Sequence, residues 1–235
     1  MKKYLFASLF LVSSCVLLAQ TNSYKGTFVN INGGMVYNNS HNIRTELNAL
    51  YGLDKKNFFD NTNFGYSAGI GGMTIVKGIV LVGASANYAI ITDQSENHIN
   101  IKLNSISGFL NAGALLYNKN KLIIYDYIGV GYGKYFMEFS NSSDSIYVDY
   151  DYENPIEPNT SQKYTSDYPL FELGIGFKRP LNDKFMIGVN LGTYFSPCRK
   201  PSLNNDGHTI KHRNAPSMEG GYIKLILEFG NISEK

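Results

Sequence analysis

The chain has 235 residues, of which 43% are apolar, 14% aromatic and 17% charged. Its 21 basic and 19 acidic residues give a formal net charge of +2, which excludes a strongly basic nucleic-acid-binding domain. The aromatic content excludes an intrinsically disordered chain. Two cysteines are too few for a disulfide scaffold or a cysteine-rich zinc site.

Residues 1–19 have the pattern of a secretory signal peptide. Two lysines precede an uncharged apolar stretch, and the junction after Ala19 suits cleavage. Processing at Cys15, as in a lipoprotein, is the alternative. Removal of residues 1–19 takes away two lysines and no acid, so the mature segment has 21 − 2 = 19 basic and 19 acidic residues and no net charge. No later apolar run is long enough for a transmembrane helix.

The rest of the chain shows the two-residue period of β-strands in eight segments. These predicted strands cover residues 26–37, 63–76, 79–92, 101–117, 122–139, 168–178, 185–195 and 220–229. Tight turns with Gly, Asn, Asp or Pro are predicted at 77–78, 118–121 and 179–184. The other connections are 38–62, 93–100, 140–167 and 196–219, of which only 93–100 is short. Short turns at one end and long loops at the other are typical of outer-membrane barrels, whose short turns are periplasmic.

Each predicted strand has one apolar face and one small or polar face. In 171–177, for example, Phe171 and Ile175 share a face, and Glu172 and Gly174 share the other. Gly, Asn and charged residues cannot bury enough apolar area to form a core. We therefore expect the apolar face to meet lipid and the other face to line a narrow lumen. The sequence predicts an all-β fold in which residues 20–235 form an eight-stranded antiparallel up-and-down transmembrane β-barrel. A soluble sandwich is the alternative.

The glycine-alternating strand Tyr127-Ile128-Gly129-Val130-Gly131-Tyr132-Gly133 and the terminal strand from Gly221 to Phe229 carry a family resemblance. The chain resembles the small eight-stranded outer-membrane barrels of the OmpA transmembrane-domain and OmpX kind, within the porin family. The resemblance covers the mature chain and implies an outer-membrane location, in contact with lipid and lipopolysaccharide. Such barrels serve as anchors, adhesins, assembly factors and occasional enzymes, so the fold leaves the function open. Six residues follow Phe229, a departure from the usual C-terminal aromatic.

Four charged residues are predicted to face the lumen. Glu172 and Lys224 lie at inward positions, each five residues before the last aromatic of its strand. We expect Glu172 and Lys224 to form a lumenal ion pair, joined by Lys178 and Glu228, that closes the lumen, because buried charges require partners. The alternative is a water-filled lumen that solvates these charges.

The segment 140–167 is acidic, with one basic and six acidic residues and a net charge of 1 − 6 = −5. Asp149, Asp151 and Glu153 alternate with tyrosines, so an extended segment places three carboxylates on one side. This pattern predicts a candidate contact for a divalent cation. A solvated acidic loop is the alternative.

The segment 196–219 is basic. Arg199, Lys200, Lys211 and Arg213 are candidates for contact with lipopolysaccharide phosphates or with the acidic segment.

No catalytic, phosphate-binding or zinc-binding motif is recognisable in the sequence. We therefore expect no enzyme activity, no cofactor, no metal centre and no nucleic-acid partner. The expected function is a structural or interaction role, exerted through extracellular loops on a protein partner, by a barrel that is not an open general porin. A component of a secretion, motility or assembly apparatus is one alternative, and an outer-membrane enzyme acting on lipid A is another.

Overall fold

The computed structural model describes residues 24–38, 64–96, 99–119, 122–141, 148–151, 154–156, 160–197, 202–205, 208–214 and 219–234. The expected signal peptide at 1–19 lies outside this part of the chain. The strands are β1 (Tyr24–Asn38), β2 (Phe64–Gly78), β3 (Val80–Glu96), β4 (Ile99–Lys119), β5 (Leu122–Asn141), β6 (Val148–Asp151), β7 (Asn154–Ile156), β8 (Thr160–Asn182), β9 (Phe185–Phe195), β10 (Ser202–Asn205), β11 (His208–Asn214) and β12 (Gly220–Glu234). Among the described residues, no helix is long and apolar enough to span a membrane.

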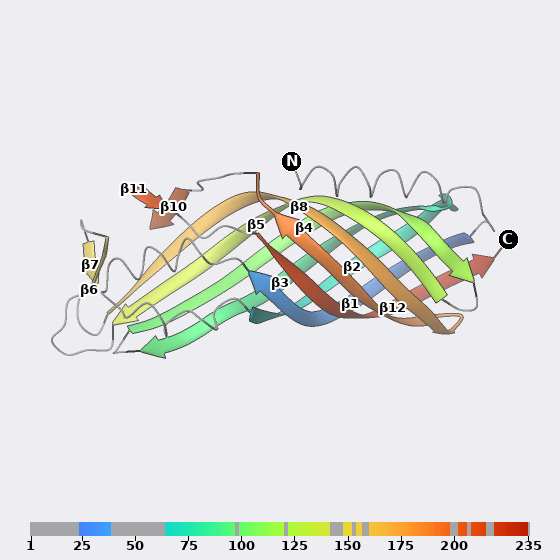
Figure 1. Cartoon of the computed structure of the whole chain (residues 1–235), viewed down its shortest axis with the longest axis horizontal. Helices are drawn as coiled ribbons and strands as arrows, with labels where there is room; N and C mark the ends of the chain where they lie inside the picture. Colours follow the sequence, from blue (N-terminus) through green and yellow to red (C-terminus); the bar gives the residue numbers. More distant parts are fainter. Residues whose placement is uncertain are drawn as a thin grey trace.

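Eight strands form a closed antiparallel barrel (Figure 1). Its order is β1-β2-β3-β4-β5-β8-β9-β12, and β12 pairs with β1 from Tyr24↔Glu234 to Asn38↔Gly220 to close it. The eight-stranded up-and-down barrel predicted from the sequence is thus confirmed. Both ends of the barrel sheet, Tyr24 and Glu234, lie at the end that carries the tight β2–β3, β4–β5 and β8–β9 turns, which we call the turn end. We call the opposite end the loop end.

Strand β8 is longer than predicted. The sequence places a strand at 168–178 and a connection at 140–167, but β8 begins at Thr160. Residues 160–167 of β8 pair with 134–141 of β5, rung by rung from Lys134↔Asp167 to Asn141↔Thr160. The extension follows from this long-range pairing, since the segment has little apolar alternation of its own.

The two faces of the barrel wall have inverted polarity compared with a soluble protein. Outward side chains in the middle of the strands are apolar and exposed, as in Val29 (61%), Leu110 (67%), Ile128 (55%) and Leu225 (62%). Inward positions bury asparagines, tyrosines and charges, which soluble proteins keep mostly at their surface. Apolar residues outside and polar residues inside are what a lipid-embedded barrel requires.

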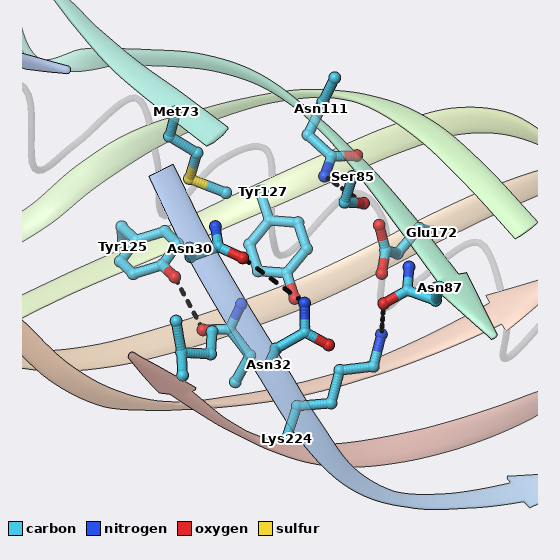
Figure 2. A pocket seen from close by; sticks show the side chains of 13 residues that line it. Asn30, Asn32, Met73, Ser85, Asn87, Asn111, Tyr125, Tyr127, Glu172 and Lys224 are labelled. Atoms are coloured by element: carbon cyan, nitrogen blue, oxygen red, sulfur yellow. Dashed lines mark hydrogen bonds between the residues drawn. The ribbon is translucent and has the colours of Figure 1, made fainter. Parts of the chain in front are cut away.

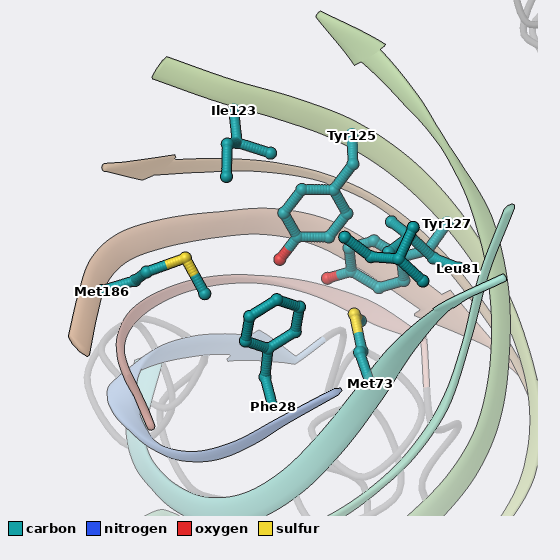
Figure 3. Packing of buried hydrophobic residues seen from close by; sticks show 8 residues of the cluster. Phe28, Met73, Leu81, Ile123, Tyr125, Tyr127 and Met186 are labelled. Atoms are coloured by element: carbon teal, nitrogen blue, oxygen red, sulfur yellow. The ribbon is translucent and has the colours of Figure 1, made fainter. Parts of the chain in front are cut away.

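The lumen is packed in layers. Near the turn end, a cluster of buried apolar residues from β1, β2, β3, β5 and β9 fills the cross-section (Figure 3). We call it the apolar plug, and its members are Phe28, Met73, Ile75, Leu81, Ile123 and Met186, in contact with Tyr125 and Tyr127. Polar side chains form the next layer toward the loop end.

Four neighbouring strands extend further at the loop end than the others. The strands β3, β4, β5 and β8 have 17, 21, 20 and 23 residues, whereas β9 has 11. A membrane strand needs only about 9–11 residues. On the outer face, exposed apolar side chains end near Ile106 and Phe136, and beyond them come Lys102, Glu138 and Lys163. Figure 1 shows β3, β4, β5 and β8 extending past the other barrel strands at the loop end. We call these extensions, which lie beyond the band of exposed apolar side chains, the wall.

Candidate functional site

The polar layer of the lumen is the candidate site. Its four charged members come from two strands: Glu172 and Lys178 from β8, and Lys224 and Glu228 from β12. All four point inward and are buried, with exposed fractions of 4%, 5%, 8% and 1% in that order. Period-two alternation places them on the inner face, as the sequence indicates. Which of them meet depends on the stagger of the strands.

Lys178 and Glu228 form a direct ion pair. Lys178 Nζ donates to Glu228 Oε1 at 2.5 Å across the intervening strand β9. The lysine stem passes over Gly188 of β9, where a Cβ would lie 2.9 Å from Lys178 Cγ. Lys178 Nζ also lies 4.2 Å from the centroid of the Tyr125 ring, a cation–π distance. The pair therefore lies against the apolar plug and is shielded from solvent.

Glu172 is held by a chain of phenols rather than by a lysine. Tyr222 donates its hydroxyl proton to Glu172 Oε1 at 2.6 Å, and the Tyr127 and Tyr222 hydroxyl oxygens are 2.5 Å apart. Because the Tyr222 proton is used toward Glu172, Tyr127 is the donor of the second bond. With its amide oriented by the surrounding network, Asn111 donates to Glu172 Oε2 at 3.3 Å. Both carboxylate oxygens are thus hydrogen-bonded.

Lys224 has neutral partners. Its Nζ donates to Asn87 Oδ1 at 2.8 Å and lies 4.3 Å from the centroid of the Tyr222 ring. In the described part of the chain, no ion pair within 4.0 Å joins Lys224 to Glu172, although both line the same small cavity (Figure 2).

The register explains which residues pair. Through β9, Glu228 is level with Met186 and hence with Pro180, two residues from Lys178 on β8. Lys224 is level with Asn190 and hence with Gly176, four residues from Glu172, or about 13 Å along the strand at ~3.3 Å per residue. Lys178 thus lies two residues along β8 from the position level with Glu228, and these two side chains meet. Glu172 lies four residues along β8 from the position level with Lys224, and these two do not form an ion pair.

Glycines make room for the tyrosines of the network. One rung of the barrel runs Tyr127↔Gly174↔Gly192↔Tyr222, so the two tyrosines lean toward each other over two glycines and meet at their hydroxyls. A side chain at Gly174 would overlap the Tyr127 ring, and one at Gly192 would overlap Tyr222. Glycine is required here because the rings lie flat on the neighbouring strands.

The next rung toward the turn end repeats this arrangement. It runs Tyr125↔Gly176↔Asn190↔Lys224, and Tyr125 donates to Asn190 Oδ1 at 2.7 Å across the gap at Gly176.

The cavity enclosed by these side chains is small. Its volume is about 30 Å³, and its lining includes Asn30, Asn32, Asn87, Glu172 and Lys224 (Figure 2). This volume suits one or two water molecules and is too small for an organic substrate. The layer is therefore suited to joining strands across the lumen, not to holding a ligand.

The two predicted loop sites fall largely outside the described residues. The backbone of Asp149 and Asp151 lies in β6, and Glu153 lies outside the description. For the basic segment, the structure gives only the backbone of Lys211 and Arg213, in β11. Arg199 and Lys200 also lie outside it. Both sites stay predictions. In the part of the chain that is described, no group of three or more His, Cys, Asp or Glu side chains is arranged to hold a metal ion.

The neutral side chains of the network are not evident from the sequence pattern. Tyr127, Tyr222, Asn87 and Asn190 hold or space the buried charges. Part of the network could, however, have been predicted from the sequence. Tyr125 and Tyr127 occupy alternate, inward positions of β5, and Gly174 and Gly176 occupy alternate, inward positions of β8. Only the register shows that these tyrosines and glycines are opposite each other.

No protein-family model and no curated protein matches the sequence. Solved structures match in fold. A major outer membrane protein from Thermus thermophilus is 11% identical with a TM-score of 0.56, covering 87% of this chain and 98% of that chain. OprG from Pseudomonas aeruginosa is 10% identical with a TM-score of 0.45, covering 92% and 100%. Ail from Yersinia pestis is 14% identical with a TM-score of 0.40, covering 91% and 100%. With its closed sheet and its apolar outer surface, the chain has the fold of the small eight-stranded outer-membrane barrels.

Proposed function

We propose that this protein is an integral outer-membrane barrel with a closed lumen, and that it binds a protein partner through the wall at its loop end. The wall carries the proposal. It consists of the upper parts of β3, β4, β5 and β8, which continue pairing up to Glu96↔Ile99 and Asn141↔Thr160. A barrel that only anchored itself would have no need of strands of 20 or more residues.

The closed lumen separates this role from that of a general porin. The apolar plug fills the barrel near the turn end, and the polar layer above it leaves a cavity of about 30 Å³. Eight strands enclose an interior just wide enough for side chains to fill. Ions would have to pass this buried apolar cluster, which supports a role outside the lumen.

The wall offers two features to a partner. Its outer face carries opposite charges at directly paired positions, since Glu138 of β5 lies opposite Lys163 of β8 and Lys102 of β4. The edge of β3 also extends past its neighbour, since residues 91–96 lie beyond the last rung of β3 with β2 at Tyr66↔Ile90, whereas β10 continues the sheet on the corresponding edge of β8. Exposed strand edges accept a further strand from a partner. The partner we propose is therefore a protein that binds the polar wall or extends its sheet.

Site-specific photo-crosslinking tests this function. A photoreactive amino acid replaces Lys163, exposed on the outer face of the wall, and in a matched variant replaces Leu110, exposed on the apolar band. We expect protein adducts at position 163 in intact cells and only lipid adducts at position 110. An absence of protein adducts from several wall positions would contradict the proposal.

The same experiment addresses the alternatives. Identification of the adducts by mass spectrometry separates a single partner from the subunits of a secretion, motility or assembly apparatus. A changed lipid A mass profile in a deletion strain would instead support the enzyme alternative.

A further inference from the structure

Basic residues gather at the turn end of the barrel. Five of them lie on the strand ends or in the β8–β9 turn and form what we call the basic rim: Lys25, Lys77, Lys119, Arg179 and Lys184. The acidic residues described at the same end are Asp183 and Glu234, so the local charge is 5 − 2 = +3. The mature chain as a whole is neutral, so this end is distinctly positive.

Arg179 shows how the rim meets its surroundings. It occupies an outward position of β8 between Phe177 and Leu181, which point to the same side and are 36% and 56% exposed. Its register partner on β9 is Ile187, also outward and 41% exposed. The exposed guanidinium therefore emerges from the lipid-facing apolar surface. Long basic side chains in this position extend their charged head to the membrane interface.

We propose that Arg179 and Lys184 of the basic rim bind the phosphates of acidic phospholipids in the leaflet at the turn end. The rim lies at the ends of the lipid-facing strands, so lipid headgroups are the anions nearest to these positions. A guanidinium donates two parallel hydrogen bonds to a phosphate. Each basic residue near an anionic lipid surface raises the association constant for that surface about fivefold, which corresponds to ~1 kcal/mol. The inference requires insertion in a membrane and is independent of the partner of the wall.

The absence of Trp from the sequence provides a direct test. Leu181→Trp creates a single Trp beside Arg179, and Leu110→Trp creates a single Trp in the middle of the apolar band on β4; selective excitation separates its emission from that of the tyrosines. Each variant is reconstituted in bilayers of equal parts phosphatidylglycerol and phosphatidylcholine, in which one or the other lipid is brominated to quench nearby Trp. The measured quantity is the ratio of the association constants of phosphatidylglycerol and phosphatidylcholine next to the Trp, obtained from the two quenching levels. We expect this ratio to be about five for Leu181→Trp and near one for Leu110→Trp.

Charge removal completes the test. Arg179→Gln with Lys184→Gln, introduced with Leu181→Trp, is expected to lower the ratio to the Leu110→Trp value, while the strand signal in circular dichroism stays unchanged. Lys184→Gln alone should give an intermediate ratio. Because Lys184 lies in the exposed β8–β9 turn, this substitution leaves the packing of the barrel unchanged.

Equal quenching by both lipids at Leu181→Trp, with Leu110→Trp still quenched, would overturn the rim proposal alone. Salt-sensitive binding to purified peptidoglycan together with equal quenching would assign the rim to a different polyanion and also overturn it. If neither Trp is quenched by any brominated lipid, the membrane location itself is wrong.

Discussion

The ion pair between Lys178 and Glu228 gives the sharpest prediction about stability. The two side chains are 5% and 1% exposed and share one bond of 2.5 Å. Lys178→Met keeps the apolar stem over Gly188 and the Tyr125 ring but leaves the Glu228 carboxylate buried without a cation. Removing one member of a buried pair costs about 3–5 kcal/mol of the free energy of unfolding. We expect Glu228→Leu to have a similar effect, at the low end of that range, because Lys178 keeps its contact with the Tyr125 ring.

The double variant separates an ion pair from a hydrated lumen. Replacing both residues by Met and Leu removes both charges, and such apolar replacements are often neutral or stabilising. We expect the free energy of unfolding of the double variant to lie within about 1 kcal/mol of the wild-type value, which with single effects of ~3 kcal/mol or more corresponds to a coupling energy of at least ~5 kcal/mol.

The assay is urea unfolding of the reconstituted barrel, followed by circular dichroism. Lys102→Met, exposed on β4 above the apolar band, is the control and should change stability by less than about 0.5 kcal/mol. If the single effects add in the double variant, with a coupling below ~0.5 kcal/mol, solvent screens the two charges and the closed-lumen reasoning is refuted.

Three further predictions concern the packing of the barrel. Gly176→Ala places a methyl group against the Tyr125 ring and should cost about 1–3 kcal/mol in the same assay, whereas Gly108→Ala, whose Cβ would lie 3.7 Å from Ser85 O, should be nearly neutral; equal effects would contradict the tyrosine-over-glycine packing. The double variant Phe28→Ala, Met186→Ala removes two large side chains from the apolar plug and should raise the ion conductance of planar bilayers. The wild type should show no stable open state. A large wild-type conductance would exclude the closed lumen. Leu110→Arg places a charge in the exposed apolar band and should cost about 2–4 kcal/mol in lipid bilayers, whereas Lys102→Ala, above the band on the same strand, should cost little; a tolerated Leu110→Arg would refute the assignment of that face to lipid.

Local pattern alone determined much of this fold. Alternation with a period of two fixes which side chains of a strand share a face. Odd-numbered residues of β12, such as Leu225 and Phe229, are therefore exposed, and even-numbered ones, such as Lys224 and Glu228, point inward. The tight connections 77–78, 118–121 and 179–184 fix three neighbouring antiparallel strand pairs, because so short a turn joins only adjacent strands. These properties depend on neighbours in the sequence, and the structure agrees with them.

The loop-end wall and the pairing inside the lumen depend on tertiary structure. Residues 160–167 become a strand because β5 offers them a ladder, not because of their own pattern. The two-residue alternation places Glu172 and Lys224 on the inner face, but it does not give their positions along the barrel axis. The stagger of the strands sets Lys224 level with Gly176, four residues from Glu172 along β8. The same stagger brings Lys178 to Glu228 and Tyr127 to Tyr222. The physical reason is that side-chain direction is a local property of a strand, whereas the height at which two strands meet is set by the register of every strand between them.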